Sequence, residues 1–394
     1  MLRIVVTGLA ATYPLGGVFW DYLQYVVGFQ KLGHDVLYVE DCCRWCYDPL
    51  QQTFVQDSES NAAYLARHIA LLDPELAERW FFRDVRGKTY GRSWEQVAEF
   101  CRSADLFINV SNSGLMREEY FAASRVAFID SDPIYTQASI RESEAASDDA
   151  WARGRVEAFR RHDVFFTFGE NAGDPDCRIP AEPLNWIATR QPIVLDRFHD
   201  AVVPLASRRR VLTTVASWEP AEKGPLLDGV SYRGKSVEFE RFITMPSASP
   251  LPMELAMSGP APIERLRAAG WRILDAYGIS ADPWAYRGYL ADSFGEWSVA
   301  KNAYVASRSG WFSCRSACYL ALGVPVIVQD TGFSRHIPAG EGILCFSTID
   351  DARAAIAELI ADPERHARAA REIAREYFAS DKVLKRFIDQ ALAG

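Results

Sequence analysis

The sequence predicts an α/β protein built from two Rossmann-like domains. Its 394 residues exceed what one typical hydrophobic core holds. An apolar strand at 3–7, a glycine-containing loop, an amphipathic helix at 19–32 and a second strand at 36–39 give the strand–loop–helix–strand order that opens a Rossmann-type half, although the G-x-G-x-x-G fingerprint of dinucleotide binding is absent. An apolar run at 210–216 restarts this order after a proline-containing linker at 180–204. Two such halves predict two sheets with helices on their faces.

The first half continues with three strands that each end in polar residues. We expect a helix at 94–102, strands at 105–110, 126–129 and 164–168, and one long helix up to about residue 160. Ligands of open parallel sheets bind off the carboxyl ends of the strands. The polar residues expected to share one cleft are therefore Asn112, Asp130, Asp132, Glu170 and Asn171.

The second half has fewer clear signals. Residues 246–262 are rich in proline, serine and methionine and indicate a loop. Helices are expected at 263–276 and at 297–306. The tail at 355–392 is helical in pattern, with two breaks.

The most informative stretch runs from residue 308 to residue 333. Small residues at 317–322 predict a short helix, and Gly323 ends it where a positive φ is wanted. Pro325 blocks continuation of the helix, and the apolar run 326–328 suits a buried parallel strand.

Three side chains at the start of this short helix predict an anion site. Ser313 and Ser316 suit a helix start because their hydroxyls can accept from otherwise unpaired backbone N–H groups. Arg315 adds a fixed positive charge beside the free N–H groups. This combination suits phosphate.

This stretch resembles the donor-binding segment of GT-B glycosyltransferases. Phe312-Ser313, nine further residues and then Gly323-Val-Pro are similar to the retaining pattern E-x-F-G-x4-E-A-M-A-x-G-x-P-V. Gly310-Trp-Phe-Ser313 is similar to the G-W-N-S of inverting plant-type enzymes. Gly310 and Cys318 replace the two glutamates of the retaining pattern, so retention and inversion both stay open. The run 294–304 is similar to a bacterial branch of the group 1, family 4-like superfamily.

The resemblance implies two domains that face each other across a cleft. It implies an acceptor domain at 1–190, a donor domain at 205–375 and a C-terminal helix at 376–394 that packs back on the first domain. The implied activity is metal-independent transfer of a hexose-type sugar from a nucleoside-diphosphate sugar, linked to UDP, GDP or dTDP, to a small-molecule or glycan acceptor. No other cofactor is expected. A nucleotide-sugar epimerase and a non-catalytic nucleotide-sugar-binding protein share this fold and remain alternatives.

Donor binding requires cations and N–H dipoles at the departing diphosphate. Any one cation can instead be a solvated surface charge. The loop 330–333 is similar to the sugar-contacting loop of the family. The expected donor-binding residues are Lys235, Lys301, Arg308, Ser313, Arg315, Ser316, Asp330, Thr331, Gly332 and Phe333.

Transfer to a hydroxyl requires a base or, for retention, a group that stabilises positive charge at the anomeric carbon. Asp21 lies four residues after Gly17, where some members of the family place an acid at the reaction centre. The helix dipole alone also favours an early aspartate. Asp130 is the second catalytic candidate, and the expected acceptor-binding residues are Gly16, Gly17, Asp132 and Glu170. The motif Asp130-Ser-Asp132 could hold a metal ion, but we expect none, because two carboxylates at this spacing are common by chance.

Charge and composition exclude some binding partners and indicate where the protein is located. The net charge of −9 argues against nucleic acid and anionic membranes, since both need a basic face. Eight cysteines without regular spacing and an N-terminus without a leader favour a cytoplasmic protein. No apolar run approaches the roughly 20 residues that span a bilayer.

Overall fold

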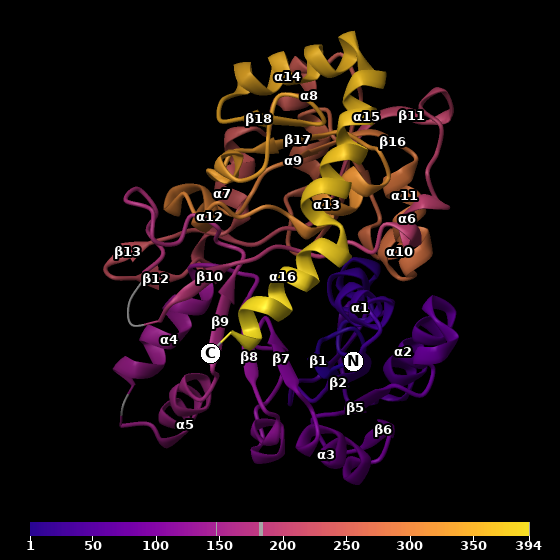
Figure 1. Ribbon diagram of the computed structural model, residues 1–394. Helices are drawn as coiled ribbons and strands as arrows, with labels where there is room; N and C mark the ends of the chain where they lie inside the picture. The colour runs from indigo at the N-terminus through magenta and orange to yellow at the C-terminus, as the bar shows by residue number, and fades with distance from the viewer. Residues whose placement is uncertain (147, 181–183, 394) are drawn as a thin grey trace.

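The computed structural model describes residues 1–146, 148–180 and 184–393, and shows two α/β domains stacked on each other (Figure 1). Within the described residues, the first sheet has eight strands: β1 (Arg3–Thr7), β2 (Asp35–Glu40), β5 (Trp80–Arg83), β6 (Thr89–Gly91), β7 (Leu106–Val110), β8 (Val126–Asp130), β9 (Val164–Thr167) and β10 (Trp186–Ala188). Their order is β10-β9-β8-β7-β1-β2-β5-β6, and only β6 runs antiparallel to its neighbour. The predicted α/β class is confirmed.

The second sheet is parallel throughout and doubly wound. Its strands are β11 (Arg209–Ser217), β14 (Met253–Ser258), β15 (Arg272–Leu274), β16 (Ser293–Ser298), β17 (Val326–Gln329) and β18 (Ile343–Phe346). The order β15-β14-β11-β16-β17-β18 reverses direction between β11 and β16. In sheets of this type, the crevice at the carboxyl ends of the strands beside the reversal is the usual ligand site.

Helices cover the faces of both sheets. In the first domain these are α1 (Gly16–Lys31), α2 (Glu59–Leu72), α3 (Trp94–Arg102), α4 (Tyr135–Ala145) and α5 (Ala150–Arg160), and α6 (Asp196–His199) lies in the segment that connects the domains, against α13. In the second domain and the tail they are α7 (Lys235–Arg241), α8 (Met245–Ala248), α9 (Ile263–Ala268), α10 (Ala276–Ser280), α11 (Pro283–Ala291), α12 (Asn302–Ser307), α13 (Cys314–Ala321), α14 (Ile349–Ala361), α15 (Pro363–Ile373) and α16 (Ser380–Leu392). Two short hairpins, β3 (Cys46–Asp48) with β4 (Thr53–Val55) and β12 (Leu226–Leu227) with β13 (Val230–Ser231), complete the fold.

Helix α1 lies between the two domains and packs closely on α11 and α16. A Cβ on Gly16 would lie 2.6 Å from the Cβ of Tyr286 in α11. A Cβ on Gly28 would lie 2.5 Å from a methyl carbon of Leu384 in α16. The two glycines therefore permit these close helix contacts, and one continuous apolar core extends from the first domain into the second.

The C-terminal helix α16 returns to the first domain, as predicted. Figure 1 shows this yellow helix descending from the second domain to the lower sheet. The ring of Phe387 packs on Phe166 of β9 with centroids 4.2 Å apart. At the end of the helix, Arg125 donates from Nε to the carbonyl of Ala391 at 3.1 Å. The last helix thus continues the chain of the second domain and packs on the first domain, so it connects the two.

Three expectations for the second domain are wrong. Strand β14 lies within 246–262, which was expected to be a loop. The helix expected at 263–276 ends early and is followed by β15. The helix expected at 297–306 begins as the end of strand β16. Buried carboxylates, Glu254 in β14 and Glu296 in β16, interrupt the apolar runs that would indicate strands, and each is paired with an arginine.

Two smaller differences concern the first domain. The stretch 180–204, expected to be a linker, contains strand β10, which pairs with β9. The long helix expected up to residue 160 is two helices, α4 and α5.

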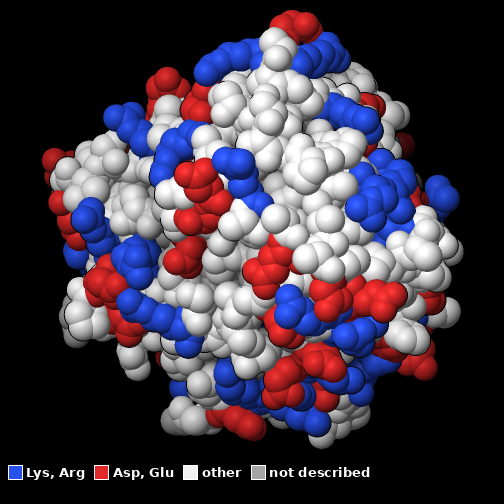
Figure 2. Space-filling model, turned by 90° about the horizontal axis from the view of Figure 1, so that it is seen from above, with Lys and Arg blue, Asp and Glu red and all other residues white. Residues whose placement is uncertain are grey.

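The surface carries charges of both signs. Figure 2 looks down on the second domain and shows lysine and arginine side chains interspersed with acidic ones over this face. The chain as a whole is acidic, with a net charge of −9. In the described part of the chain, no helix is both long enough and apolar enough to cross a membrane.

Candidate functional site

A pocket lies at the start of α13, beside the point where the order of the second sheet reverses. It encloses about 270 Å³ of empty space, part of it open to solvent. The pocket is formed by the carboxyl ends of β16 and β17 and by the loop before α13. Its lining residues are Ser298, Val299, Ala300, Trp311, Phe312, Ser313, Arg315, Ser316, Val328, Gln329, Thr331 and Phe333.

The start of α13 offers the pocket two hydroxyl groups. Ser313 is the N-cap residue, but its side chain accepts no hydrogen bond from the helix. The hydroxyl of Ser316 is fully buried and has no hydrogen-bond partner among the described residues. The prediction that these hydroxyls cap the helix is therefore wrong. A buried hydroxyl without a partner is costly, and an anion at the helix start would supply one.

Arg315 reaches the pocket as a rigidly held cation. Its Nε donates to Glu296 at 2.7 Å, and its Nη1 donates to the carbonyl of Val215 at 2.7 Å. Its Nη2 lies 2.7 Å from the same oxygen of Glu296, whose side chain is fully buried. A guanidinium has five N–H donors in a fixed fork, so donors remain for a ligand.

Lys235, at the start of α7, adds a half-buried cation. Burial and, to a smaller extent, the nearby charges of Arg315 and Lys301 lower the pKa of its ammonium to about 7, although Glu219 and Glu296 act in the opposite direction. No hydrogen bond or ion pair joins this ammonium to another residue in the described ranges. A cation held beside other cations without its own acid is suited to an anionic ligand.

Asp21, in α1 of the first domain, faces the start of α13 across the domain interface. Burial raises the pKa of its carboxyl to about 7, while the charge of Arg315 and a hydrogen bond with the thiol of Cys314 lower it. A carboxyl group that titrates near neutrality can take a proton from a hydroxyl at pH 7. The structure thus brings together a predicted acid and a predicted cation from different domains.

Asp130 is fully buried, and its carboxylate accepts hydrogen bonds from several neighbouring side chains. It accepts from the hydroxyls of Thr136 at 2.6 Å and Thr167 at 2.8 Å, and from the side chain of Gln137 at 3.1 Å. The backbone N–H of Asp132 is 3.1 Å away. Burial raises the pKa of Asp130 to about 6 despite these contacts. They favour a structural role at the loop after β8, and we assign Asp130 no part in catalysis.

Lys301 and Asp132, expected on the donor and acceptor sides, pair with each other. The ammonium of Lys301 lies 3.0 Å from Asp132 and 3.9 Å from Glu219. It also lies 4.2 Å from the centre of the Tyr135 ring. The hydroxyl of Tyr304 donates to Asp132. This pair therefore links the two domains beside Lys235, outside the lining of the pocket.

Other expected site residues have structural partners. Arg308, whose side chain is half exposed, donates to Asp176 at 2.8 Å and does not line the pocket. Glu170 forms a buried ion pair with Arg190. These contacts favour a role for Arg308 and Glu170 in the fold.

Gly16 and Gly17 lie where α1 meets the second domain. A Cβ on Gly17 would lie 3.6 Å from the hydroxyl of Tyr286, an ordinary contact distance, whereas one on Gly16 would clash with the Cβ of Tyr286. Gly16 therefore permits close helix packing, the space at Gly17 does not require glycine, and no described contact places either residue at an acceptor.

The loop 330–333 is held against the segment before α13. The hydroxyl of Thr331 donates to the carbonyl of Trp311 at 2.6 Å, and Phe333 is buried against Phe312. Asp330 accepts from the backbone N–H of Gly332 at 2.8 Å, which closes a tight turn. Thr331 and Phe333 line the pocket, whereas Asp330 and Gly332 shape its loop.

Two parts of the site were not predicted from the sequence: Glu296, the partner of Arg315, and the pocket wall at 298–300, which belongs to a segment expected to be helical. An acid between Phe294 and Trp297 is a usable signal: a buried carboxylate in an apolar segment requires a cationic partner.

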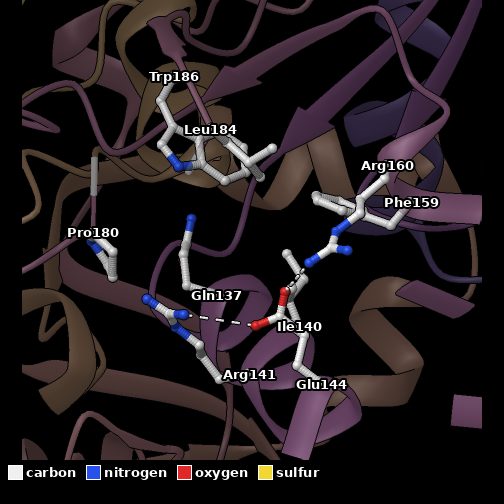
Figure 3. A pocket seen from close by; sticks show the side chains of 9 residues that line it. All are labelled: Gln137, Ile140, Arg141, Glu144, Phe159, Arg160, Pro180, Leu184 and Trp186. Atoms are coloured by element: carbon white, nitrogen blue, oxygen red, sulfur yellow. Dashed lines mark hydrogen bonds and ion pairs between the residues drawn. The ribbon is translucent and has the colours of Figure 1, made fainter. Parts of the chain in front are cut away.

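A larger hollow lies elsewhere, between α4, α5 and β10 (Figure 3). It encloses about 420 Å³ of empty space, and Phe159 and Trp186 form its apolar walls. Figure 3 shows Glu144 between Arg141 and Arg160, at 3.6 Å and 2.7 Å. None of the expected site residues lines this hollow.

Solved structures of the same architecture extend over the whole chain. An alpha-glucosyltransferase in complex with UDP and a 13-mer DNA containing an HMU base aligns with a TM-score of 0.60 at 13% identity, over 99% of both chains. AviGT4, a glycosyltransferase involved in avilamycin A biosynthesis, aligns with a TM-score of 0.53 at 13% identity, over 99% of this chain and 97% of its own. HepE from Anabaena, in complex with UDP and glucose, aligns with a TM-score of 0.53 at 11% identity, over 100% of both chains. No protein-family model and no curated protein matches the sequence. The chain has the GT-B fold, in which two Rossmann-like domains face each other.

Proposed function

We propose that this protein is a glycosyltransferase that moves a sugar from a nucleoside-diphosphate sugar to a hydroxyl group of a small-molecule or glycan acceptor. The observation that carries the proposal is one pocket where the unpaired hydroxyl of Ser316, the held guanidinium of Arg315 and the nearby ammonium of Lys235 meet a helix start. Asp21, on the opposite domain, lies close enough to Cys314 and Arg315 at the start of α13 for both to lower the pKa of its carboxyl. The structural neighbours named above are glycosyltransferases, which supports the reaction class.

The cations act on the leaving group. When the bond between the anomeric carbon and the phosphate oxygen breaks, its electron pair stays on the diphosphate. The free donors of Arg315, the ammonium of Lys235 and the N–H groups at the start of α13 stabilise this added charge. Because these groups supply positive charge at the diphosphate, we propose that transfer requires no metal ion.

Asp21 acts at the other side of the anomeric carbon. In an inverting reaction, its carboxylate takes the proton of the acceptor hydroxyl as the new carbon–oxygen bond forms. In a retaining reaction, the departing phosphate oxygen takes that proton, and Asp21 stabilises the positive charge at the anomeric carbon. The anomeric configuration of the product, measured by NMR, distinguishes the two.

A thermal-shift screen with UDP-, GDP-, dTDP- and ADP-linked sugars, with and without magnesium, tests the donor site. A ligand at a hundred times its dissociation constant adds about 2.7 kcal/mol of stability. We expect one nucleotide to raise the melting temperature equally with EDTA and with magnesium. Stabilisation by none of the four would overturn the proposal.

Turnover then separates transfer from the other functions that this fold supports. A transferase releases the nucleoside diphosphate faster when its acceptor is present. Conversion of the sugar of the donor without an acceptor would indicate an epimerase. Binding without either reaction, across a panel of glycan and small-molecule acceptors, would indicate a binding protein.

A further inference from the structure

One side chain of the first domain is inserted between two loops of the second domain. Asn171 belongs to the loop after β9 and is fully buried. Its amide nitrogen donates to the carbonyl of Arg308 at 2.8 Å and to the carbonyl of Gly332 at 3.2 Å. Its amide oxygen lies 2.9 Å from Nε2 of His336. The backbone N–H of Asn171 also donates to the carbonyl of Ser309 at 3.1 Å.

Two glycines make room for this amide group. Gly310 has φ of +77°, and a Cβ there would lie 2.7 Å from the amide oxygen of Asn171. Gly332 has φ of +89°, and a Cβ there would lie 2.6 Å from the amide nitrogen. At both positions the backbone conformation and the space require glycine. The two loops are therefore shaped around Asn171.

Both loops continue directly into the wall of the pocket. The residue after Gly310 is Trp311, which begins the segment that reaches Ser313 at the start of α13. Gly332 lies between Thr331 and Phe333, which both line the pocket. A shift of either loop would thus move the lining of the pocket.

The same interface carries ion pairs, but these are exposed. Asp176 lies 2.8 Å from Arg308 and 2.6 Å from Arg335, and all three side chains are between 38% and 50% exposed. Exposed ion pairs contribute little to stability and are screened by salt. Loss of a buried hydrogen-bonding group leaves its partners unsatisfied, which costs more. Asn171, which is fully buried, therefore donates two hydrogen bonds to these loops from the first domain, and the indole N–H of Trp311 adds one to the carbonyl of Ser131 at 3.1 Å.

We propose that Asn171 is a positioning residue, through which the first domain holds the donor pocket of the second domain in its binding geometry. Donor binding then depends on contact between the two domains, although Asn171 itself lines no part of the pocket. This inference rests on the proposed function, because it takes the pocket to be the nucleotide site.

The test compares Asn171→Ala with a matched control, Asp176→Asn, which changes the same loop at its exposed ion pairs. The affinity of each variant for UDP, GDP and dTDP is measured by calorimetry, and its melting temperature is measured without ligand. We expect Asn171→Ala to weaken binding of the nucleotide that the unchanged protein prefers by tenfold or more. Asp176→Asn should change it by less than threefold. If Asn171→Ala does not fold, Asn171→Ser takes its place with the same expected loss.

A double-mutant cycle distinguishes positioning from general damage. Gly332→Ala introduces the same backbone strain in both backgrounds, but its clash with the amide exists only when Asn171 is present. We expect Gly332→Ala to weaken nucleotide binding less in the Asn171→Ala background than in the unchanged protein. Equal losses would overturn the inference.

The possible failures are separable. Tight nucleotide binding by both the unchanged protein and Asn171→Ala would overturn the positioning role alone. If the unchanged protein binds none of the three nucleotides, the proposed function fails, and this inference fails with it.

Discussion

Asp21 of the first domain and Arg315 of the second lie close enough across the domain interface for the guanidinium to act on the carboxyl. The guanidinium lowers the pKa of the carboxyl, but burial outweighs it, so that the pKa of Asp21 rises to about 7. A buried Asp21 far from any cation would stay neutral at pH 7, and an exposed one would stay ionised. The position of Arg315 therefore brings the titration of Asp21 into the range where a base is useful.

The first prediction concerns Arg315 and its partner Glu296. Arg315→Ala leaves a fully buried carboxylate without its cation, which we expect to lower the free energy of unfolding by about 3–5 kcal/mol. The double variant Arg315→Met, Glu296→Gln removes both charges and should regain most of this stability without regaining nucleotide binding. Urea denaturation and ligand-induced melting shifts measure the two effects. Nucleotide binding by the double variant with unchanged affinity would contradict the role of Arg315.

Glu296→Gln alone is the control for that experiment. It keeps the guanidinium and its hydrogen bond to the carbonyl of Val215. We expect it to retain nucleotide binding within about tenfold, so that any larger loss in the double variant is due to Arg315.

The second prediction is a narrow pH optimum. Asp21 is ionised above its pKa of about 7, and Lys235 is protonated below its pKa of about 7. The value of kcat/KM should therefore rise towards pH 7 as Asp21 loses its proton and fall above pH 7 as Lys235 loses its charge. Lys235→Arg keeps its charge at high pH and should remove the fall. The same fall in Lys235→Arg would assign it to another group.

The third prediction separates catalysis from donor binding. Asp21→Asn keeps the size of the side chain and removes the group that takes the proton, so kcat should fall by about 10²–10⁴-fold. The dissociation constant of the nucleotide should change by less than about threefold, because the groups proposed to bind the diphosphate all lie on the second domain. Steady-state kinetics and calorimetry measure the two. A loss of binding that parallels the loss of kcat would assign Asp21 to the donor instead.

The sequence predicted those parts of the fold that depend on local pattern. Strands β1 and β7 are each built on three consecutive apolar residues, at 4–6 and at 106–108, and a turn at a glycine ends α13, where Gly323 has φ of +69°. Strands β14 and β16 were not predicted, because each contains a carboxylate whose arginine partner lies far away in the sequence. A charged residue inside an apolar run is normally taken as a sign that the position is exposed, so the run is not recognised as a buried strand.

In the candidate site, too, features that depend on local sequence could be predicted, whereas features that depend on contacts between distant residues could not. Residues 313–316 follow one another in the chain, and their position at a helix start could be read directly. The pairing of Lys301 with Asp132 joins residues of different domains, and nothing in either local sequence indicates it. The insertion of Asn171 between two loops depends on domain contact in the same way. Sequence pattern thus located the start of α13, whereas the contacts that decide which cations remain free required the tertiary structure.

The last prediction concerns the packing of α1 on the C-terminal helix. A Cβ on Gly28 would lie 2.5 Å from Leu384 and 3.1 Å from Ser380, both in α16. Gly28→Ala should therefore lower the free energy of unfolding by about 1–3 kcal/mol, although alanine is the better helix former. Gly154→Ala in α5 is the matched control, because a Cβ there meets no atom within 4 Å. It should raise stability by about 0.4–1 kcal/mol. Urea denaturation of both variants decides the point: if Gly28→Ala is stabilising too, α16 does not pack tightly on α1.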